Sequence, residues 1–455
     1  MMRRISADPR KTGEPLSTDN VPAEDRAVVN FATFQLFSII YLEKFAVGPL
    51  KFQISVPLLI MFVSLVWMIV TRSVTFSSTR ISLYLIFVSC CLFAQVLANS
   101  VGSIPSMAEL FLLYAFMTTS APLSEAGYRR VLDNFIKLMI VPAVIILIQY
   151  GIQKITGRGD PISMTYLLPK SVLMQGYTYE AHFPNWNSPF QRPNGFFFLE
   201  PSFASFFTAS AAIIELTFFR RPFFVIFTLI ATALTQGGTG VTLLVLASPA
   251  LLARESRRIV VPLVIVTVVG VFLAYLSGIQ LPLISRLGEL DQSSVGAGYE
   301  SSGALRLIIP WNNLIELLSN PSYLFTGTGA GSTGPSLGNP WPILKLTREY
   351  GIIAMISYVV FVASAFTGKY NVPLKIAAWV VFNFTGGYLL DPSLILFFSV
   401  VFCIIEPVTR DKEVEEFGYK WRNRLVAGLG GPSGRPSESR RAQQSAEKHS
   451  SLVSR

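Results

Sequence analysis

Apolar stretches of about 15 to 20 residues recur along most of this chain and alternate with short polar loops. An apolar run of about 20 residues is long enough to cross the hydrocarbon core of a bilayer as a helix. The pattern therefore predicts an all-α polytopic membrane protein of about twelve transmembrane helices. The predicted ranges are 28–43, 52–71, 81–98, 104–119, 134–153, 201–219, 222–236, 239–253, 259–278, 349–367, 375–389 and 392–408.

The composition also indicates that lipid is the solvent. The chain has 455 residues, of which 51% are hydrophobic and only 14% charged, whereas soluble proteins carry roughly 25% charged residues. A net charge of +10 can indicate a nucleic-acid partner, but here the basic residues lie mostly in short loops and in the tails, which is typical of the cytoplasmic side of membrane proteins. We therefore expect no nucleic-acid partner. Cys90, Cys91 and Cys403 lie in apolar runs and indicate neither disulfides nor a metal site.

Loop charge predicts the orientation of the chain in the membrane. If the amino tail is cytoplasmic, each cytoplasmic loop carries at least two basic residues, and the short outer loops near Ser103, Gly238 and Asp391 carry none. The first outer loop, with Lys44 and Lys51, is the exception. The basic residues of the predicted cytoplasmic loops are Arg72, Arg80, Arg129, Arg130, Arg220, Arg221, Arg254, Arg257, Arg258, Lys369 and Lys375.

Basic residues also follow the last stretch, so both termini of this predicted inner-membrane protein are expected to be cytoplasmic. Three parts result: a tail over 1–27, a membrane region over 28–408 and a tail over 409–455 that is rich in Gly, Ser and Arg and is expected to be disordered. Two long segments, about 154–200 and 279–348, then lie outside. Loops of that length are uncommon without a function.

The first long segment ends in Glu200-Pro201-Ser202. Proline favours the first position of a helix, so the sixth stretch should begin at Pro201 with Glu200 at its mouth. Glu200 would either complement the helix dipole or serve as a functional carboxylate that orients Arg192 or takes a proton. His182 lies in the same segment, where a single histidine is commonly just solvated.

The second long segment holds Arg306 ahead of an amphipathic stretch that is typical of a helix on the membrane surface, where Arg306 would either snorkel to water or bind a lipid pyrophosphate. Gly327 and Gly329 follow, in a turn that is either flexible or able to direct N–H groups to an anion. Lys345, Arg348 and Glu349 then open the tenth stretch. No His or Cys cluster indicates a metal site.

The order of these motifs resembles the O-antigen polymerase and O-antigen ligase superfamily (Wzy and WaaL type). The resemblance covers about residues 28–408. The matching features are Arg192 ahead of Glu200-Pro201-Ser202, the Ser/Thr/Gly-rich turn over 235–240, Arg306, Gly327-x-Gly329 and Glu349-x-Gly351. One departure is the absence of a histidine in Gly338-Asn339-Pro340-Trp341, where ligases of the superfamily usually carry one.

The resemblance implies a GT-C-like fold and a metal-independent glycosyltransferase that uses a glycan on undecaprenyl pyrophosphate, on the periplasmic face and without a cofactor. The residues that would stabilise negative charge on the leaving pyrophosphate are Arg192, Arg306, Lys345 and Arg348. Gly327 and Gly329 would form part of the substrate site. The acceptor's proton would go to Glu200, Glu349 or His182, and the residues do not choose among these three.

The missing histidine favours a polymerase of exopolysaccharide or O-antigen repeat units over a ligase that transfers the glycan to lipopolysaccharide core. Polysaccharide assembly and chain-length proteins would be its partners. Two readings from other classes stay open: a transporter or flippase for a polysaccharide precursor, and a structural component of an assembly complex. Few ionisable residues fall in the middle of the predicted spans, which argues against transport.

Overall fold

The computed structural model describes residues 21–49, 53–98, 102–121, 123–157, 163–177, 179, 190–253, 261, 309–319, 321–333, 340–386 and 388–407. These residues belong to one compact unit, Met1–Pro407. The described chain is mostly helical, and its strands form two short antiparallel pairs. β1 (Ala46–Val47) pairs with β2 (Ile54–Ser55), and β3 (Thr75–Phe76) pairs with β4 (Thr119–Ser120).

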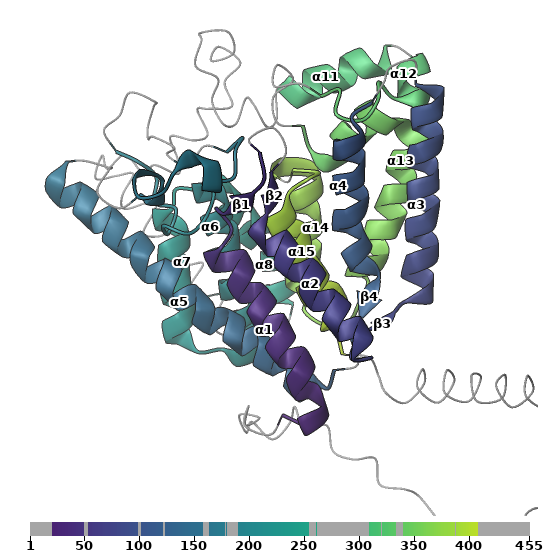
Figure 1. Ribbon diagram of the computed structural model, residues 1–455. Helices are drawn as coiled ribbons and strands as arrows, with labels where there is room; N and C mark the ends of the chain where they lie inside the picture. Colours follow the sequence, from purple (N-terminus) through teal and green to yellow (C-terminus); the bar gives the residue numbers. More distant parts are fainter. Residues whose placement is uncertain are drawn as a thin grey trace, which may run out of the picture. The chain divides into compact units, whose positions relative to one another are not determined.

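The helices follow one another through the described chain as Figure 1 shows. They are α1 (Arg26–Tyr41), α2 (Val56–Val70), α3 (Ser78–Leu97), α4 (Ile104–Ala115), α5 (Glu125–Thr156), α6 (Pro201–Ile214), α7 (Pro222–Leu234), α8 (Gly238–Leu252), α11 (Ile309–Leu318), α12 (Pro321–Thr326), α13 (Pro342–Phe366), α14 (Val372–Val381) and α15 (Pro392–Phe398). Short π-helical segments, Glu215–Phe219, Phe382–Gly386 and Ser399–Ile404, continue α6, α14 and α15.

The apolar helices confirm the expectation of a helical membrane protein in its coarse form. Within the described residues, four helical segments are long and apolar enough to cross a bilayer: Ser78–Leu97, Glu125–Thr156, Pro201–Phe219 and Pro342–Phe366. Six shorter apolar helices of 10–17 residues accompany them. Every predicted stretch except 259–278 overlaps a described helix, and 259–278 lies almost entirely outside the described residues. The count of twelve spans and the GT-C-like fold stay predictions.

Prolines and small polar caps determine where the helices begin. A proline stands in the first two positions of nine described helices, where the missing N–H costs nothing. They are α2, α4, α6, α7, α11, α12, α13, α14 and α15. Ser55 and Ser124 accept hydrogen bonds from N–H groups of the first turns of α2 and α5.

Two predicted boundaries were wrong. The fifth stretch was predicted to begin at 134, but α5 begins at Glu125, because Ser124 caps a polar first turn that hydropathy alone passes over. The tenth was predicted to begin at 349, but α13 begins at Pro342 and is interrupted at Gly351, whose φ of 80° is not helical.

Hydrogen bonds between helix ends define two opposite ends of the bundle. At one end, the Leu199 N–H donates to Glu43 and the Ser103 N–H donates to Ala330 O. At the other end, Ser124 donates to Asp25 and the Ala121 N–H donates to Ile404 O. We name these the Glu200 end and the Arg221 end, after a residue at each. The hairpin of β1 and β2 lies at the Glu200 end, and β3 with β4 lies at the Arg221 end.

This arrangement agrees with the alternation of loop charge. Five basic residues that were predicted to share one side of the membrane lie at the Arg221 end. Arg72 follows α2 and Arg221 precedes α7, while Arg80, Arg129 and Lys375 lie near the starts of α3, α5 and α14. The described residues of the functional motifs lie at the Glu200 end. Which end faces the cytoplasm stays a prediction.

α6 is the interior helix that positions the Glu200 end. In its most apolar window 78% of the residues are buried by protein, against 17% in α3. Its Phe206 and Phe207 pack edge-on against Phe397 and Phe398 of α15. α11 and α12 lie across the ends of α3, α4 and α13 (Figure 1). The start of α6 is therefore held in a fixed protein environment rather than in lipid.

Candidate functional site

α6 begins at Pro201, as predicted, and this places Glu200 at the edge of the protein interior. Pro201 occupies the first helical position, and Glu200 precedes it in an extended conformation with φ −138° and ψ 160°. The carboxylate makes no capping hydrogen bond to the first turn, and its Oε2 instead accepts the Ser202 hydroxyl at 3.1 Å. Glu200 is half-buried, whereas nearly all of the helix behind it is buried.

Glu43 and Lys44 bring two more charges to this place from the end of α1. Glu43 Oε2 accepts the N–H of Leu199, the residue before Glu200, at 3.0 Å. Both side chains are buried, at 1% exposure for Glu43 and 0% for Lys44. The Lys44 Nζ lies 5.5 Å from the centre of the Tyr179 ring, and its carbonyl accepts the Met174 N–H at 2.8 Å. The loop that carries Tyr177 and Tyr179 is thus fixed to α1.

Asp391 adds a third carboxylate from the start of α15. Its Oδ1 accepts the N–H groups of Ser393 at 2.9 Å and of Leu394 at 3.2 Å, so Asp391 caps the helix. Its side chain is completely buried. Asp391-Pro392-Ser393 therefore repeats at α15 the acid-Pro-Ser start that Glu200-Pro201-Ser202 gives to α6.

The three carboxylates interact electrostatically. Burial, with a smaller contribution from the charge of Glu200, raises the pKa of Asp391 to about 7. Burial and then the charge of Asp391 raise the pKa of Glu43 well above its usual range, and Lys44 opposes this. The hydroxyl of Tyr177 lies in the field of all three carboxylates. We name Glu43, Lys44, Tyr177, Tyr179, Glu200 and Asp391 the carboxylate cluster.

A second group forms where the Gly-x-Gly turn contacts α13. The Thr328 N–H donates to Arg348 O at 2.7 Å, and the Gly329 N–H donates to Glu349 O at 3.1 Å. These are carbonyls of the last turn before the break at Gly351. In an unbroken helix they would accept from N–H groups four residues further on. The turn therefore caps the first half of α13, and two motifs separated in sequence are joined.

The turn's own N–H groups are already engaged in protein hydrogen bonds. Besides Thr328 and Gly329, the Gly327 N–H donates to Tyr323 O at 2.9 Å and the Ala330 N–H donates to Gln95 Oε1 at 2.7 Å. In this conformation the turn can contribute to a substrate site by fixing Arg348 and Glu349, and has no N–H left for a phosphate over residues 327–330.

Glu349 lies inside the protein with Lys345 one turn before it. The Glu349 side chain is 1% exposed, and its Oε1 lies 3.9 Å from Lys345 Nζ. Arg348 is half-buried on the same turn of α13. Lys345, Arg348 and Glu349 thus form one local group of two cations and a carboxylate, next to the turn that contains Gly327 and Gly329.

The approach to Glu200 is fixed by α5. Gln149 donates to Asn194 at 3.3 Å and accepts the Gly195 N–H at 2.9 Å, and Gln153 accepts the Gln191 N–H at 3.0 Å. Arg192 is held between these contacts and is half-buried. His182 and Arg306 lie outside the described residues, so their predicted roles stay predictions.

The Ser/Thr/Gly-rich turn over 235–240 packs against α6. Ser205 Oγ donates to Gly237 O at 2.8 Å and accepts the Gly240 N–H at 2.9 Å. A Cβ at Gly240 would overlap the Ser205 backbone. This motif therefore holds α8 close to the helix that begins at Glu200.

Sequence reasoning missed Glu43, Lys44, Asp391 and the two tyrosines. Two signals could have found the charged members. Lys44 breaks the rule of uncharged outer loops, and in the structure its side chain is buried. Asp391 repeats the acid-Pro-Ser pattern that singled out Glu200. Tyr177 and Tyr179 carry no such signal, because their place depends on the fold of a long loop.

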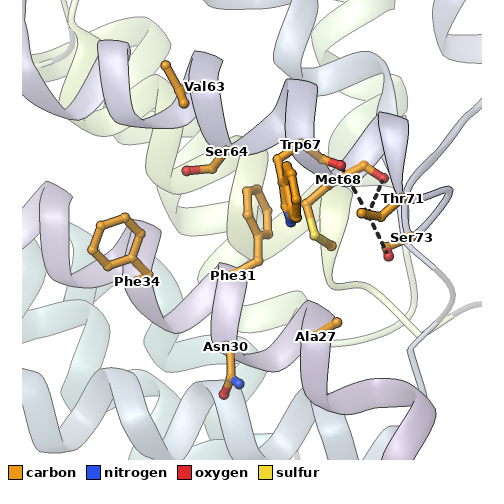
Figure 2. Close-up of a pocket in the computed structure, with 10 residues that line it drawn as sticks. All are labelled: Ala27, Asn30, Phe31, Phe34, Val63, Ser64, Trp67, Met68, Thr71 and Ser73. Carbon is orange, nitrogen blue, oxygen red and sulfur yellow. Dashed lines mark hydrogen bonds between the residues drawn. The ribbon is translucent and has the colours of Figure 1, made fainter.

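The described residues contain no group of three or more His, Cys, Asp or Glu side chains arranged to hold a metal ion. They do contain a groove of about 570 Å³ between α1 and α2 (Figure 2), lined mainly by apolar side chains such as Phe31, Phe34, Val63, Trp67 and Met68. Its lining comes mainly from the first half of α1 and the second half of α2, so the groove lies toward the Arg221 end. It is therefore distant from the carboxylate cluster and from the group of Lys345, Arg348 and Glu349.

No protein-family model, curated protein or solved structure matches the chain. The resemblance to the O-antigen polymerase and ligase superfamily accordingly stays a hypothesis that rests on the motifs and on their geometry.

Proposed function

We propose that the chain is a metal-independent glycosyltransferase that polymerises oligosaccharide repeat units carried on undecaprenyl pyrophosphate, at the periplasmic face of a bacterial inner membrane. The observation that carries the proposal is the contact between the Gly327-x-Gly329 turn and the Arg348–Glu349 carbonyls. The Gly327-x-Gly329 turn and the Glu349-x-Gly351 motif are therefore in contact, at the same end of the bundle as Glu200.

Glycosyl transfer from a pyrophosphate needs cations beside the leaving group and a base beside the acceptor, and the Glu200 end has residues of both kinds. An acceptor hydroxyl attacks the sugar carbon bonded to the pyrophosphate, and the bond from that carbon to the phosphate oxygen breaks. Lys345 and Arg348, with Arg192 and Arg306 from the long segments, would stabilise negative charge on the leaving group. Glu200, Glu349 or His182 would accept the proton of the hydroxyl.

The direct test uses the purified full-length protein in lipid nanodiscs with an undecaprenyl-pyrophosphate-linked oligosaccharide. Glycans longer than one repeat unit, formed in the presence of a chelator, support a metal-independent polymerase. A strain lacking the protein should then accumulate single repeats on the carrier. Long polymer on the carrier in that strain would instead identify a ligase, and the absence of transfer to any acceptor would contradict the proposal.

A transporter or flippase is the second candidate, because two observations favour it. α13 is interrupted at Gly351, and transporters commonly bind their substrates at interrupted helices. Glu43, Lys44 and Asp391 are buried ionisable groups, which often mark transport routes. Movement of a lipid-linked oligosaccharide across proteoliposomes, without elongation, would decide for this candidate.

A further inference from the structure

The groove between α1 and α2 is built from one face of each helix. Phe31 and Phe34 line it from α1, and Ser64 and Trp67 line it from α2. The members of each pair are three residues apart, so each pair lies on one helical face. Figure 2 shows the Phe31 ring extending from α1 toward Trp67 and Met68 of α2. The two helices thus leave between them a space of about 570 Å³ that a ligand can occupy.

The groove has a floor of protein and an open side. Phe31 and Met68 form the floor, at 7% and 4% exposure, whereas Val63 and Trp67 are each 67% exposed at its edges. α2 is one of the apolar helices that indicate a membrane protein. A groove of apolar side chains that opens along such a helix suits a hydrocarbon chain, because the chain removes apolar surface from contact with water or with loosely packed lipid.

The groove ends within the thickness of the membrane. Beyond Phe34, the Gln35 Nε2 lies 3.5 Å from Ile60 O, and the hairpin of β1 and β2 joins the two helices at the Glu200 end. The Ser64 hydroxyl donates to the same carbonyl at 2.7 Å, so Ser64 needs no hydrogen bond from an occupant. From Arg26 to Phe34, α1 rises about 12 Å, less than half of a hydrocarbon core about 30 Å thick. An occupant that enters from the Arg221 end therefore stays within one leaflet.

The open end of the groove is polar and positively charged. Thr71 and Ser73 line this end, and their hydroxyl oxygens lie 3.1 Å apart. Arg72 stands between them in the sequence, and Arg26 directly precedes the first lining residue of α1. Both arginines are exposed. The groove thus runs from two cations at the Arg221 end to an apolar interior.

Two carboxylates precede Arg26, and one of them is withdrawn from the surface. Asp25 is buried, and its carboxylate accepts the Ser124 N–H at 3.1 Å. Glu24 is exposed. Among the described residues next to the open end, two exposed arginines therefore stand against one exposed carboxylate, and this balance favours an anionic group at the membrane surface.

We propose that this groove binds one acyl chain of an anionic phospholipid from the leaflet at the Arg221 end, with the lipid phosphate beside Arg26 and Arg72. A phospholipid has the same distribution of chemistry as the groove, an apolar chain below an anionic head. Trp67 at the edge agrees with this position, because tryptophan is enriched where a membrane meets water. The inference is independent of glycosyl transfer and of which end faces the cytoplasm.

A second copy of the chain fits this face less well. In a dimer about a two-fold axis along the membrane normal, equivalent residues of the two copies lie at the same depth. Contact through the groove would therefore bring Arg26 and Arg72 of both copies together at one surface, and like charges across an interface are unfavourable. A lipid phosphate instead meets both arginines with the opposite charge.

The first experiment measures binding through Trp67. The full-length protein in detergent is titrated with phosphatidylglycerol that carries bromine on its acyl chains, which quenches tryptophan fluorescence on contact. The chain has six tryptophans, so the contribution of Trp67 is taken as the difference between the wild type and Trp67→Phe. This contribution should be quenched saturably, and brominated phosphatidylcholine should need at least about tenfold more lipid. Identical curves for the two lipids would overturn the proposal.

Two pairs of variants test the two halves of the site. Arg26→Gln combined with Arg72→Gln should remove the preference for phosphatidylglycerol, whereas Arg129→Gln, which removes another cation of the Arg221 end, should keep it. Ser64→Leu fills the groove and should weaken binding at least about tenfold. Ser82→Leu is its matched control, because Ser82 on α3 is exposed and also donates to the carbonyl four residues earlier, at 3.0 Å.

Thermal unfolding provides a second readout. A lipid that binds only the folded protein raises the Tm, so phosphatidylglycerol should stabilise the wild type and Ser82→Leu more than Ser64→Leu. If Ser64→Leu fails to fold, the double arginine variant decides the question alone. Wild-type lipid binding in folded Ser64→Leu would contradict the proposal. A wild-type dimer in light scattering that Ser64→Leu dissociates would likewise overturn it and would assign the groove to a second copy.

Discussion

The backbone carbonyl of Glu349 accepts the N–H of Gly329 at 3.1 Å, which joins the Gly-x-Gly turn to the broken start of α13. The contact needs two glycines. A Cβ on Gly327 would lie 2.5 Å from the Glu349 carbonyl carbon and oxygen, and a Cβ on Gly351 would overlap Phe325 O. Both have positive φ, at 72° and 80°. The position of Glu349 therefore depends on the absence of side chains at both glycines.

We expect Gly327→Ala to destabilise the protein and to lower transfer activity. The added methyl group meets backbone atoms that cannot move independently, and the positive φ adds strain, for a total of about 2 kcal/mol or more. Gly151→Ala in α5 is the matched control, because nothing lies within 4 Å of its Cβ position. Thermal unfolding in detergent should show a lower Tm for Gly327→Ala and an unchanged or slightly higher Tm for Gly151→Ala. Equal Tm values would mean that the turn is not held against α13.

A second prediction concerns the Arg221 end. Glu215 is completely buried and accepts two hydrogen bonds from the Arg221 guanidinium, one from Nε at 3.0 Å and one from a terminal nitrogen at 2.7 Å. Arg221 also donates to Asp133 at 2.9 Å. Arg221→Ala would leave the buried Glu215 carboxylate without its cation and Asp133 with Lys137 as its one remaining cation, at 2.6 Å, among the described residues. Removal of one partner of a buried ion pair commonly costs about 3–5 kcal/mol. Removal of the exposed Arg129–Glu125 pair by Glu125→Gln should cost less than about 1 kcal/mol. Chemical denaturation of both variants tests this, and a small effect of Arg221→Ala would refute the buried network.

The sequence predicted what is local at the candidate site. Pro201 determines the start of α6, and hence the place of Glu200, through the backbone of adjacent residues alone. The apolar pattern likewise predicted most of the helices, because lipid or protein must cover each of them. The start of α13 was misjudged because Pro342 begins the helix before its apolar part, and hydropathy reports only the latter.

The rest of the site depends on contacts between distant segments. Leu199 meets Glu43, and Gly329 meets Glu349, only after the helices have packed. The break at Gly351 is likewise stable because a turn from elsewhere caps the exposed carbonyls. In the sequence Lys44 stands out only as an exception to the loop-charge rule, and its burial could not be predicted because burial is a property of the tertiary structure.

A third prediction tests which end of the bundle faces outward. In a protein whose three cysteines are replaced by serine, Ser171→Cys and Ser332→Cys place exposed thiols at the Glu200 end, and Thr71→Cys places one at the Arg221 end. An impermeant thiol reagent should label the first two in intact spheroplasts and Thr71→Cys only after permeabilisation. The reverse pattern would exclude a periplasmic site at Glu200.

A fourth prediction concerns Arg306, which the sequence alone nominates. Arg306→Lys should lose most transfer activity while the protein stays folded, because a guanidinium offers a planar fork to phosphate oxygens and an ammonium offers a single point charge. The measurement is polysaccharide output together with the amount of folded protein in the membrane. Near-normal output would show that Arg306 only snorkels to water.

The last prediction follows from the burial of Asp391, whose pKa is raised to about 7 from 3.8. The folded protein keeps this proton at pH values where the unfolded chain has lost it, so the stabilising contribution is complete below about pH 4 and is lost as the pH rises through about 7. A shift of about 3 pKa units corresponds to about 4 kcal/mol at most. Over pH 5 to 8 the Tm of the wild type should therefore fall more steeply than that of Asp391→Asn, which cannot ionise and keeps the cap of α15.

Asp25→Asn is the matched control for that experiment. Asp25 is also buried, but Ser124 donates to its carboxylate, and it lies at the Arg221 end. The pH dependence of its Tm should follow the wild type. If Asp391→Asn also followed the wild type, Asp391 would be ionised in the folded protein across this range, and the negative charge of the cluster would have to be compensated by a group other than a proton.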